Sequence, residues 1–267
     1  MIQEAIKKEV MDRLRKEILA AEGLQRQAYE PKLDMGLPAL ASAFPDQTFP
    51  TGCIHEFISP DMESAAATAG FITALLGYMA KQKGPCIWVS RHRRLFAPAL
   101  FAFGLPPDQV IFIHPDKDRD LLWTTEQALK CRGLAAVIAD VPDLDLTASR
   151  RLQLAVEQSR VTGLLHRYLP GNTGHTACVA RWQIKPLSSE TGDLPGMGAP
   201  RWQVNLLKVR NGRPGTWIID WAIDHFELNT QFQQSGPAKI DHFELSRQLQ
   251  QSGPAKEVYV YPKAARA

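Results

Sequence analysis

PTGCIHEFISPDMESAA, residues 50–66, is the stretch from which the fold of this chain is best predicted. It begins with turn residues, Pro50 to Gly52, and continues as a short apolar strand from Cys53 to Ile58. A tight loop then leads into the start of a helix. Strand, loop and helix follow in this order where nucleotide-binding α/β domains hold phosphate groups. The order therefore predicts the framework of such a domain.

The phosphate-binding chemistry is missing from this framework. A working loop follows the pattern G-x-x-x-x-G-K-[ST], in which glycines let backbone N–H groups face phosphate oxygens, the lysine reaches the β- and γ-phosphates, and the hydroxyl binds Mg²⁺. Alanines stand where the lysine and the hydroxyl are needed, and two carboxylates would face the anion. The residues at these positions are Ser59, Pro60, Asp61, Met62, Glu63, Ser64, Ala65 and Ala66. We expect a degenerate loop, no bound nucleotide or other cofactor, and no enzymatic activity.

Composition and charge narrow the class of protein. The chain has 267 residues, of which 45% are hydrophobic, so it can bury a large core. Its formal net charge of +3 is nearly balanced and by itself indicates no nucleic-acid partner. The four cysteines do not form a C-x-x-C pair, which favours a reduced, cytoplasmic protein. No apolar run approaches the ~20 residues that cross a membrane, so we expect no membrane contact.

Residues 1–30 are predicted to form an amphipathic helix. Apolar side chains recur at every fourth position, with charges of both signs between them. They are Ile2, Ile6, Val10, Leu14 and Ile18. The stripe could pack on the protein's own core, or it could dock on a neighbouring subunit or another protein. The spacing alone leaves both interpretations open.

Residues 31–222 are predicted to form the core domain, an α/β fold with a mostly parallel central sheet. Nearly continuous apolar strands alternate with helices, which is typical of a parallel sheet covered on both faces. The strands are expected at Cys53–Ile58, Pro85–Ser90, Val110–His114, Ala135–Asp140 and Val161–His166. The helices are expected at Met62–Lys83, in the apolar run up to Phe103, at Asp118–Arg132, and from the N-cap Thr147 to Ser159. From Ala177 apolar and polar residues alternate, which predicts an antiparallel hairpin turning at 211–215.

Residues 223–267 are predicted to form a tail that contains an internal duplication with a period of 17 residues. IDHFEL occurs at 223–228 and 240–245, and QQSGPAK occurs at 233–239 and 250–256. Two copies of so short a unit do not make a solenoid. We favour a tolerated duplication in a partly ordered tail. The alternative is a doubled docking motif, in which Phe226 and Phe243 are the anchors and linkage adds avidity.

Three further features are weighed against simpler interpretations. A basic cluster follows the second strand, at the sheet edge where ligands bind, and consists of Arg91, Arg93 and Arg94. We favour the interpretation that these arginines are solvated surface charge. The alternative is that they contact a DNA backbone. Asp140 ends an apolar strand, where an ATPase holds a magnesium-side carboxylate, but without the lysine we assign it no catalytic role. Glu56, inside a strand, is expected to be a paired or edge-facing acid.

The seven histidines are dispersed without ligand spacing, so no metal site is predicted.

Two long segments carry a resemblance to a known family. They are LDLTASRRLQLAVEQSRVTGLLHR, Leu144 to Arg167, and PRWQVNLLKVRNGRPGTWIIDW, Pro200 to Trp221. FPTGCIHEF, Phe49 to Phe57, also resembles the RecA-type entry to its phosphate loop. Over about residues 36–222 the chain resembles the ImuA family, which is related to RecA and SulA and belongs to bacterial mutagenesis cassettes. The resemblance implies a RecA-like fold and a DNA-damage-inducible (SOS) role in DNA repair. It also implies partners: the Y-family polymerase-like subunit ImuB, an error-prone DnaE-type polymerase, and RecA itself.

Together these features predict a non-catalytic accessory protein of translesion synthesis that acts through protein–protein contacts. Because RecA-type proteins dock protomers by an N-terminal helix, we expect the helix stripe to engage RecA or a partner subunit. Its contact residues would be Ile6, Val10, Leu14 and Ile18. One alternative is a SulA-like inhibitor that binds the tubulin-like division protein. Another is a weak ATPase that uses Asp140 with an unconventional cation.

Overall fold

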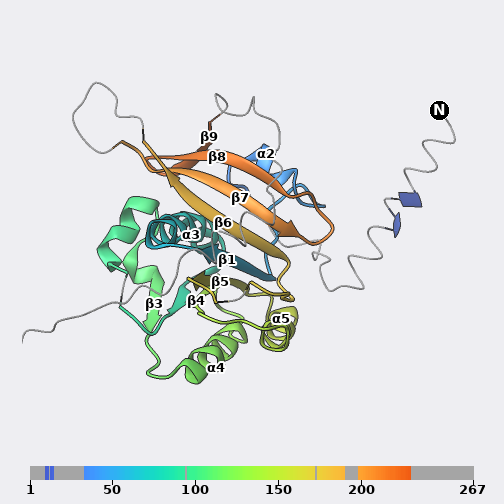
Figure 1. Cartoon of the computed structure of the whole chain (residues 1–267), viewed down its shortest axis with the longest axis vertical. Coiled ribbons are helices and arrows are strands. Elements are labelled where there is room, and N and C mark those ends of the chain that lie inside the picture. The colour runs from blue at the N-terminus through green and yellow to red at the C-terminus, as the bar shows by residue number, and fades with distance from the viewer. Residues whose placement is uncertain are drawn as a thin grey trace, which may run out of the picture. The chain divides into compact units, whose positions relative to one another are not determined.

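The computed structural model describes residues 33–93, 95–171, 173–189 and 198–229, together with residues 10, 11, 13 and 14. Residues 1–234 belong to one compact unit and residues 235–267 to a second. The described residues of the first unit form a nine-stranded sheet in the order β3-β2-β4-β5-β1-β6-β7-β8-β9 (Figure 1). Its central strand, β1 (Ile54–Ser59), lies between β5 (Thr162–Tyr168) and β6 (Ala180–Leu187) and is buried along its whole length.

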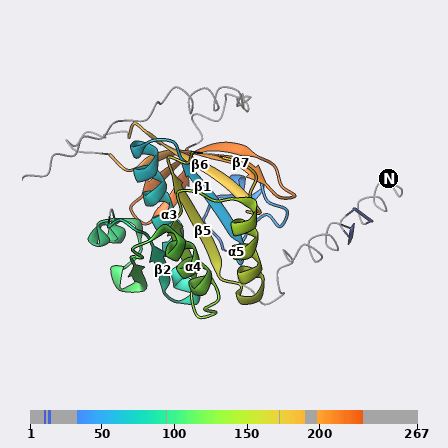
Figure 2. The ribbon, with the colours of Figure 1, turned by 60° about the horizontal axis from the view of Figure 1, so that its bottom comes forward.

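The parallel part of the sheet matches the expected strands. β2 (Cys86–Val89) pairs with β3 (Val110–Ile113) and with β4 (Ala136–Asp140), and β4 pairs with β5. The continuous apolar strands predicted a sheet with both faces covered, and helices do cover both faces (Figure 2). One face packs on α3 (Met62–Lys83), which is apolar around most of its circumference. The other packs on α4 (Asp118–Leu129) and α5 (Leu146–Ser159).

The antiparallel part is larger than the predicted hairpin. β6, β7 (Arg201–Val209), β8 (Gly215–Ala222) and β9 (His225–Leu228) pair antiparallel in sequence order, and they appear in yellow to orange in Figure 1. The predicted α/β class, with a mostly parallel central sheet and antiparallel C-terminal strands, is therefore confirmed.

The first copy of the repeated motif is part of this sheet, which corrects the boundary placed at residue 222. Phe226, on β9, is 2% exposed. Its ring lies 5.1 Å from that of Trp221, 5.3 Å from that of Phe71 and 5.6 Å from that of Tyr78, measured between centroids. Phe226 is therefore a core residue and not the exposed docking anchor that the second interpretation of the repeat required. The error arose because four residues are too short a run for alternation to be recognised as a strand.

Two local predictions also need correction. Asp145 caps α5, because its carboxylate accepts a hydrogen bond of 2.6 Å from the backbone N–H of Ala148, whereas Thr147 lies inside the helix. The apolar run before Gly104 forms the 3₁₀ helix η1 (Ala97–Phe103), and Gly104 ends it at a φ of 71° as a left-handed cap. Two other short helices in residues 33–229 are α2 (Pro38–Ala41) and η2 (Pro107–Gln109).

Several predicted contact residues lie outside the described residues: Ile6, Ile18, Arg94 and Phe243, with both QQSGPAK copies. Val10 and Leu14 are described, are helical, and are 41% and 46% exposed. Docking by this stripe therefore remains a prediction. No helix among the described residues has the length and apolarity needed to cross a membrane.

Candidate functional site

The connection between β1 and α3 occupies the place of a phosphate-binding loop. Ser59 is the last residue of β1, and α3 begins at Met62, so only Pro60 and Asp61 lie between them. The other five residues of the degenerate loop, from Met62 to Ala66, belong to the first turns of α3. A connection of two residues is too short to wrap backbone N–H groups around a phosphate chain.

The N-terminus of α3 is already satisfied by a side chain of the protein. The Asp61 carboxylate accepts a hydrogen bond of 2.6 Å from the backbone N–H of Ser64. Anions bind at helix N-termini because unpaired N–H groups and the helix dipole attract them. Here a carboxylate takes that place, and its charge opposes a phosphate. Asp is a preferred N-cap residue, so its position before the apolar helix was a signal that the sequence contained.

A row of polar side chains joins β1, β5 and β4 next to this connection. Ser59 Oγ lies 2.9 Å from Thr68 Oγ1 of α3 and 2.9 Å from His166 Nε2 of β5. His166 Nδ1 lies 3.3 Å from Asp140 Oδ1, and the two residues are register partners on β5 and β4. This contact does not form a hydrogen bond, and the buried Oδ1 atom has no hydrogen-bond donor among the described residues. Spacing alone could not reveal this row, since its members come from four elements.

The order of contacts resembles a Ser–His–Asp relay, but it does not form a hydrolase site. Ser59 is fully buried and also holds the Thr68 hydroxyl, so no substrate carbonyl can approach its oxygen. The direction of the hydrogen bond between Ser59 and His166 depends on the histidine tautomer. The row therefore positions His166 and Asp140 at the sheet edge.

A cavity of about 460 Å³ opens beside this row, at the C-terminal ends of the parallel strands. Ligands of open α/β sheets bind at this edge, and the volume is within the range of small-ligand sites. Its wall is mainly apolar, with Met62, Ala65, Ala66, Ala69, Trp88 and Leu121 among the residues that line it. Ala65 and Ala66 hold the positions where the lysine and hydroxyl of a working loop would stand. The cavity therefore lies where a nucleotide would bind but presents a different chemistry.

The basic cluster is partly neutralised at this cavity. Arg91 donates two hydrogen bonds to the Asp118 carboxylate, of 2.9 and 3.0 Å. Arg91 and His92 line the cavity, and Arg93 is exposed outside its lining. Pairing with Asp118 cancels one of the charges that a DNA backbone would need. No three His, Cys, Asp or Glu side chains come together as a metal site within the described part of the chain.

A second cluster of charges lies in the middle of the sheet. The Glu56 carboxylate accepts hydrogen bonds from Arg167 at 2.7 Å, from Arg181 at 2.8 Å and from Thr176 at 2.9 Å. Glu56 and Arg167 are almost completely buried. The expectation that Glu56 is a paired acid is confirmed. Its partners on β5 and β6 were not predicted, because they are more than a hundred residues away in sequence.

The buried titratable groups near β1 are not reactive. Burial lowers the pKa of His55 to about 4, and its Nε2–H donates to the Pro50 carbonyl at 2.8 Å while Nδ1 accepts from the Trp182 indole at 3.2 Å. Burial also raises the pKa of the Cys53 and Cys178 thiols to about 12. A thiol must ionise to act as a nucleophile, so these cysteines have a packing role.

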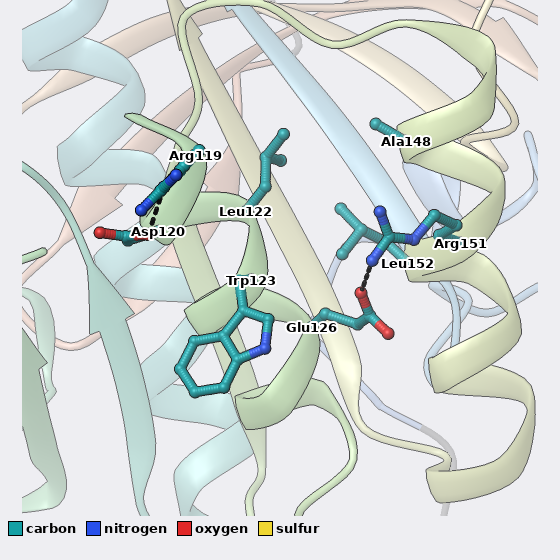
Figure 3. Close-up of a pocket in the computed structure, with 8 residues that line it drawn as sticks. All are labelled: Arg119, Asp120, Leu122, Trp123, Glu126, Ala148, Arg151 and Leu152. Carbon is teal, nitrogen blue, oxygen red and sulfur yellow. Dashed lines mark hydrogen bonds and ion pairs between the residues drawn. The ribbon is translucent and has the colours of Figure 1, made fainter. Parts of the chain in front are cut away.

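Another cavity, of about 570 Å³, lies between α4 and α5. Figure 3 shows Trp123 and Leu122 of α4 facing it, with charged pairs on either side. Arg151 donates to Glu126 at 2.5 Å, and Arg119 to its neighbour Asp120 at 3.3 Å. The pKa of Glu126 is lowered, first by the hydrogen bond that Lys130 donates to its carboxylate and then by the positive charge of Arg151. The charges of this groove compensate one another, and its lining residues differ from those of the cavity at the sheet edge.

The fold and this site define an α/β protein with a mostly parallel central sheet, in which a carboxylate of the protein itself caps the helix N-terminus where a phosphate would bind. No family model matches the chain. Two curated relatives are Protein ImuA from Caulobacter vibrioides strains NA1000 / CB15N and ATCC 19089 / CIP 103742 / CB 15. Each is 37% identical over 202 residues, covering 71% of this chain and 83% of the relative. The chain therefore belongs to the ImuA family, as its resemblance predicted. Among solved structures, the KaiC-like protein PH0186 from Pyrococcus horikoshii OT3 is 13% identical with a TM-score of 0.49, covering 74% of this chain and 99% of that one.

Proposed function

We propose that this protein is a non-catalytic accessory protein of damage-induced mutagenesis. It acts through contacts with an ImuB-like polymerase subunit, with RecA, or with both, beside a DnaE-type polymerase in translesion synthesis. Membership of the ImuA family supports the biological setting. The observation that carries the non-catalytic part is the filled N-terminus of α3, where Asp61 takes the place of a bound phosphate.

Without ATP turnover, we expect this protein to act by binding other proteins. A RecA-like sheet without a phosphate loop has no means to couple ATP turnover to movement. Its exposed apolar side chains then become the features to explain, and the N-terminal helix presents Val10 and Leu14 to solvent. An amphipathic helix of this kind can dock into an apolar groove on a partner.

The proposal is tested by affinity purification of the tagged protein from cells after DNA damage. The unmodified protein should recover the ImuB-like subunit or RecA, and the Val10→Asp/Leu14→Asp variant should lose it. Leu154→Asp is the matched control, because Leu154 is a similarly exposed leucine on α5. Unchanged recovery by a well-folded double variant would remove the helix from the proposal.

The same experiment separates the rival functions. Recovery of the tubulin-like division protein instead of polymerase subunits would favour a SulA-like inhibitor. The non-catalytic part has its own test, in which purified protein is titrated with ATP and Mg²⁺. Magnesium-dependent turnover that Asp140→Asn abolishes would overturn it and establish a weak ATPase.

A further inference from the structure

The cavity at the sheet edge carries a charge opposite to the one a nucleotide site needs. Among the described residues, its lining includes one arginine, Arg91, which is held by Asp118 through two hydrogen bonds. Among the described residues, the second carboxylate in the lining, Asp140, is paired with no lysine or arginine, and His166 Nδ1 lies 3.3 Å from it. Apart from its two histidines, the charged side chains of the described lining sum to −1. The site therefore repels a phosphate and attracts a cation.

The Asp140 carboxylate is prepared to accept a hydrogen bond. Its Oδ1 atom is buried and has no hydrogen-bond donor among the described residues, although Nδ1 of His166 lies 3.3 Å away. A buried acceptor without a donor is costly, and the rest of the Asp140 side chain, which is 34% exposed, is the part that a ligand in the cavity can reach. The row from Thr68 through Ser59 fixes His166, so the histidine ring is held where it is.

The rest of the wall fits an apolar stem. Ala65, Ala66 and Ala69 on α3 provide small side chains, and Trp88 provides an indole. An arginine side chain combines these two requirements, since its methylene stem packs on apolar surface and its planar guanidinium donates several hydrogen bonds and stacks on aromatic rings. An adenine nucleotide would place phosphates where the uncompensated carboxylate lies.

We propose that this cavity is a docking site for an arginine side chain of a partner protein, with Asp140 accepting hydrogen bonds from the guanidinium. The position that holds a triphosphate in working RecA-like proteins is thereby converted into a protein-recognition pocket. The inference deepens the proposed function, on which it rests for the existence of a partner, and it names the chemistry by which that partner is recognised.

The inference is tested on the purified full chain with N-acetyl-arginine amide as the probe. N-acetyl-citrulline amide is the matched control, because it has nearly the same shape without the charge. Binding is followed by NMR chemical shifts and tryptophan fluorescence. We expect arginine to bind about tenfold more tightly than citrulline, because a hydrogen bond to a charged group is stronger than a neutral one. The arginine-induced shifts should map to Asp140, Trp88 and the start of α3.

Variants separate the cavity from the rest of the surface. Asp140→Asn should reduce arginine binding to the citrulline level, and Glu126→Gln, in the groove between α4 and α5, should leave it unchanged. Equal binding of arginine and citrulline by the unmodified protein, or arginine shifts confined to the α4–α5 groove, would overturn the inference even if Asp140→Asn failed to fold. Arginine binding without recovery of a polymerase subunit or RecA would instead count against the proposed function and leave the pocket standing.

Discussion

Glu56 and Asp140 both lie on strands of the parallel sheet, but their surroundings differ. Glu56 is in the middle of β1 and accepts hydrogen bonds from two arginines and a threonine. Asp140 ends β4, and its partner among the described residues is His166, at 3.3 Å and without a hydrogen bond. Burying a charge costs free energy unless its partners replace the lost water. In the middle of the sheet, side chains of the protein supply the partners of the Glu56 carboxylate. At the edge of the sheet, a ligand could supply partners that Asp140 lacks.

The comparison explains which cluster is structural and which is a candidate site. Arg167 and Arg181 come from β5 and β6, the two neighbours of β1, so the Glu56 cluster ties three adjacent strands together. Asp140 borders a cavity and is partly exposed. Removing a member of the first cluster should therefore damage the fold, while removing Asp140 should damage recognition.

The largest expected effect is that of Glu56→Gln. The substitution leaves two arginines, one of them buried, without their carboxylate, and breaking a buried ion pair costs roughly 4 kcal/mol. Asp140→Asn, the matched carboxylate-to-amide change at the sheet edge, should cost less than about 1 kcal/mol. Urea unfolding of both variants measures the difference. Similar losses for the two would break the comparison.

Phe226→Ala tests whether the last strand belongs to the stable part of the sheet. Phe226 packs among Phe71, Tyr78 and Trp221, so truncation should leave a cavity and cost about 3 kcal/mol of unfolding free energy. Ile223→Ala is the control, because Ile223 lies in the preceding turn and is 93% exposed. If Phe226→Ala and the Ile223→Ala control had equal unfolding free energies, residues 223–228 would not belong to the stable core.

Mild acid tests a buried neutral group on the same strand as Glu56. The pKa of His55 is lowered from 6.5 to about 4 by burial, so the unfolded chain takes up a proton at a higher pH than the folded one. This contribution to stability is complete above pH 6.5 and is lost as the pH falls towards 4. At pH 5 the loss is about 2 kcal/mol. Urea midpoints at pH 7 and pH 5 should differ less for His55→Gln than for the unmodified protein, and equal differences would remove His55 as the cause.

Much of the fold could be predicted because its signals are local. The continuous apolar strands and the long apolar helix Met62–Lys83 each carry their own periodicity, and the missing lysine can be read from the segment 59–66 alone. β9 was missed because four residues carry too little pattern, and the cap of α5 because Asp145 and Thr147 are both good N-cap residues.

The site was less accessible to prediction because its contacts are long-range. Asp140 could be placed at the sheet edge from its strand, but its neighbour His166 depends on the order of β4 and β5 in the sheet. The pairing of Arg91 with Asp118 and of Glu56 with Arg181 likewise joins residues far apart in sequence. The basic cluster is therefore less positive than its sequence indicates, since only the fold shows which of its charges are neutralised.

The smallest expected effect concerns Asp61, the carboxylate that fills the phosphate position. Asp61→Ala removes the cap of α3 and should cost about 1 kcal/mol, whereas Asp61→Ser keeps an N-cap oxygen and should cost only a few tenths. Neither variant should bind ATP, because Ala65 and Ala66 still stand where the lysine and hydroxyl are required. Urea unfolding and an ATP titration with Mg²⁺ measure the two properties separately. If Asp61→Ser bound ATP, the Asp61 charge alone would be the barrier, and the sheet edge would be a blocked nucleotide site instead of one rebuilt for a cation.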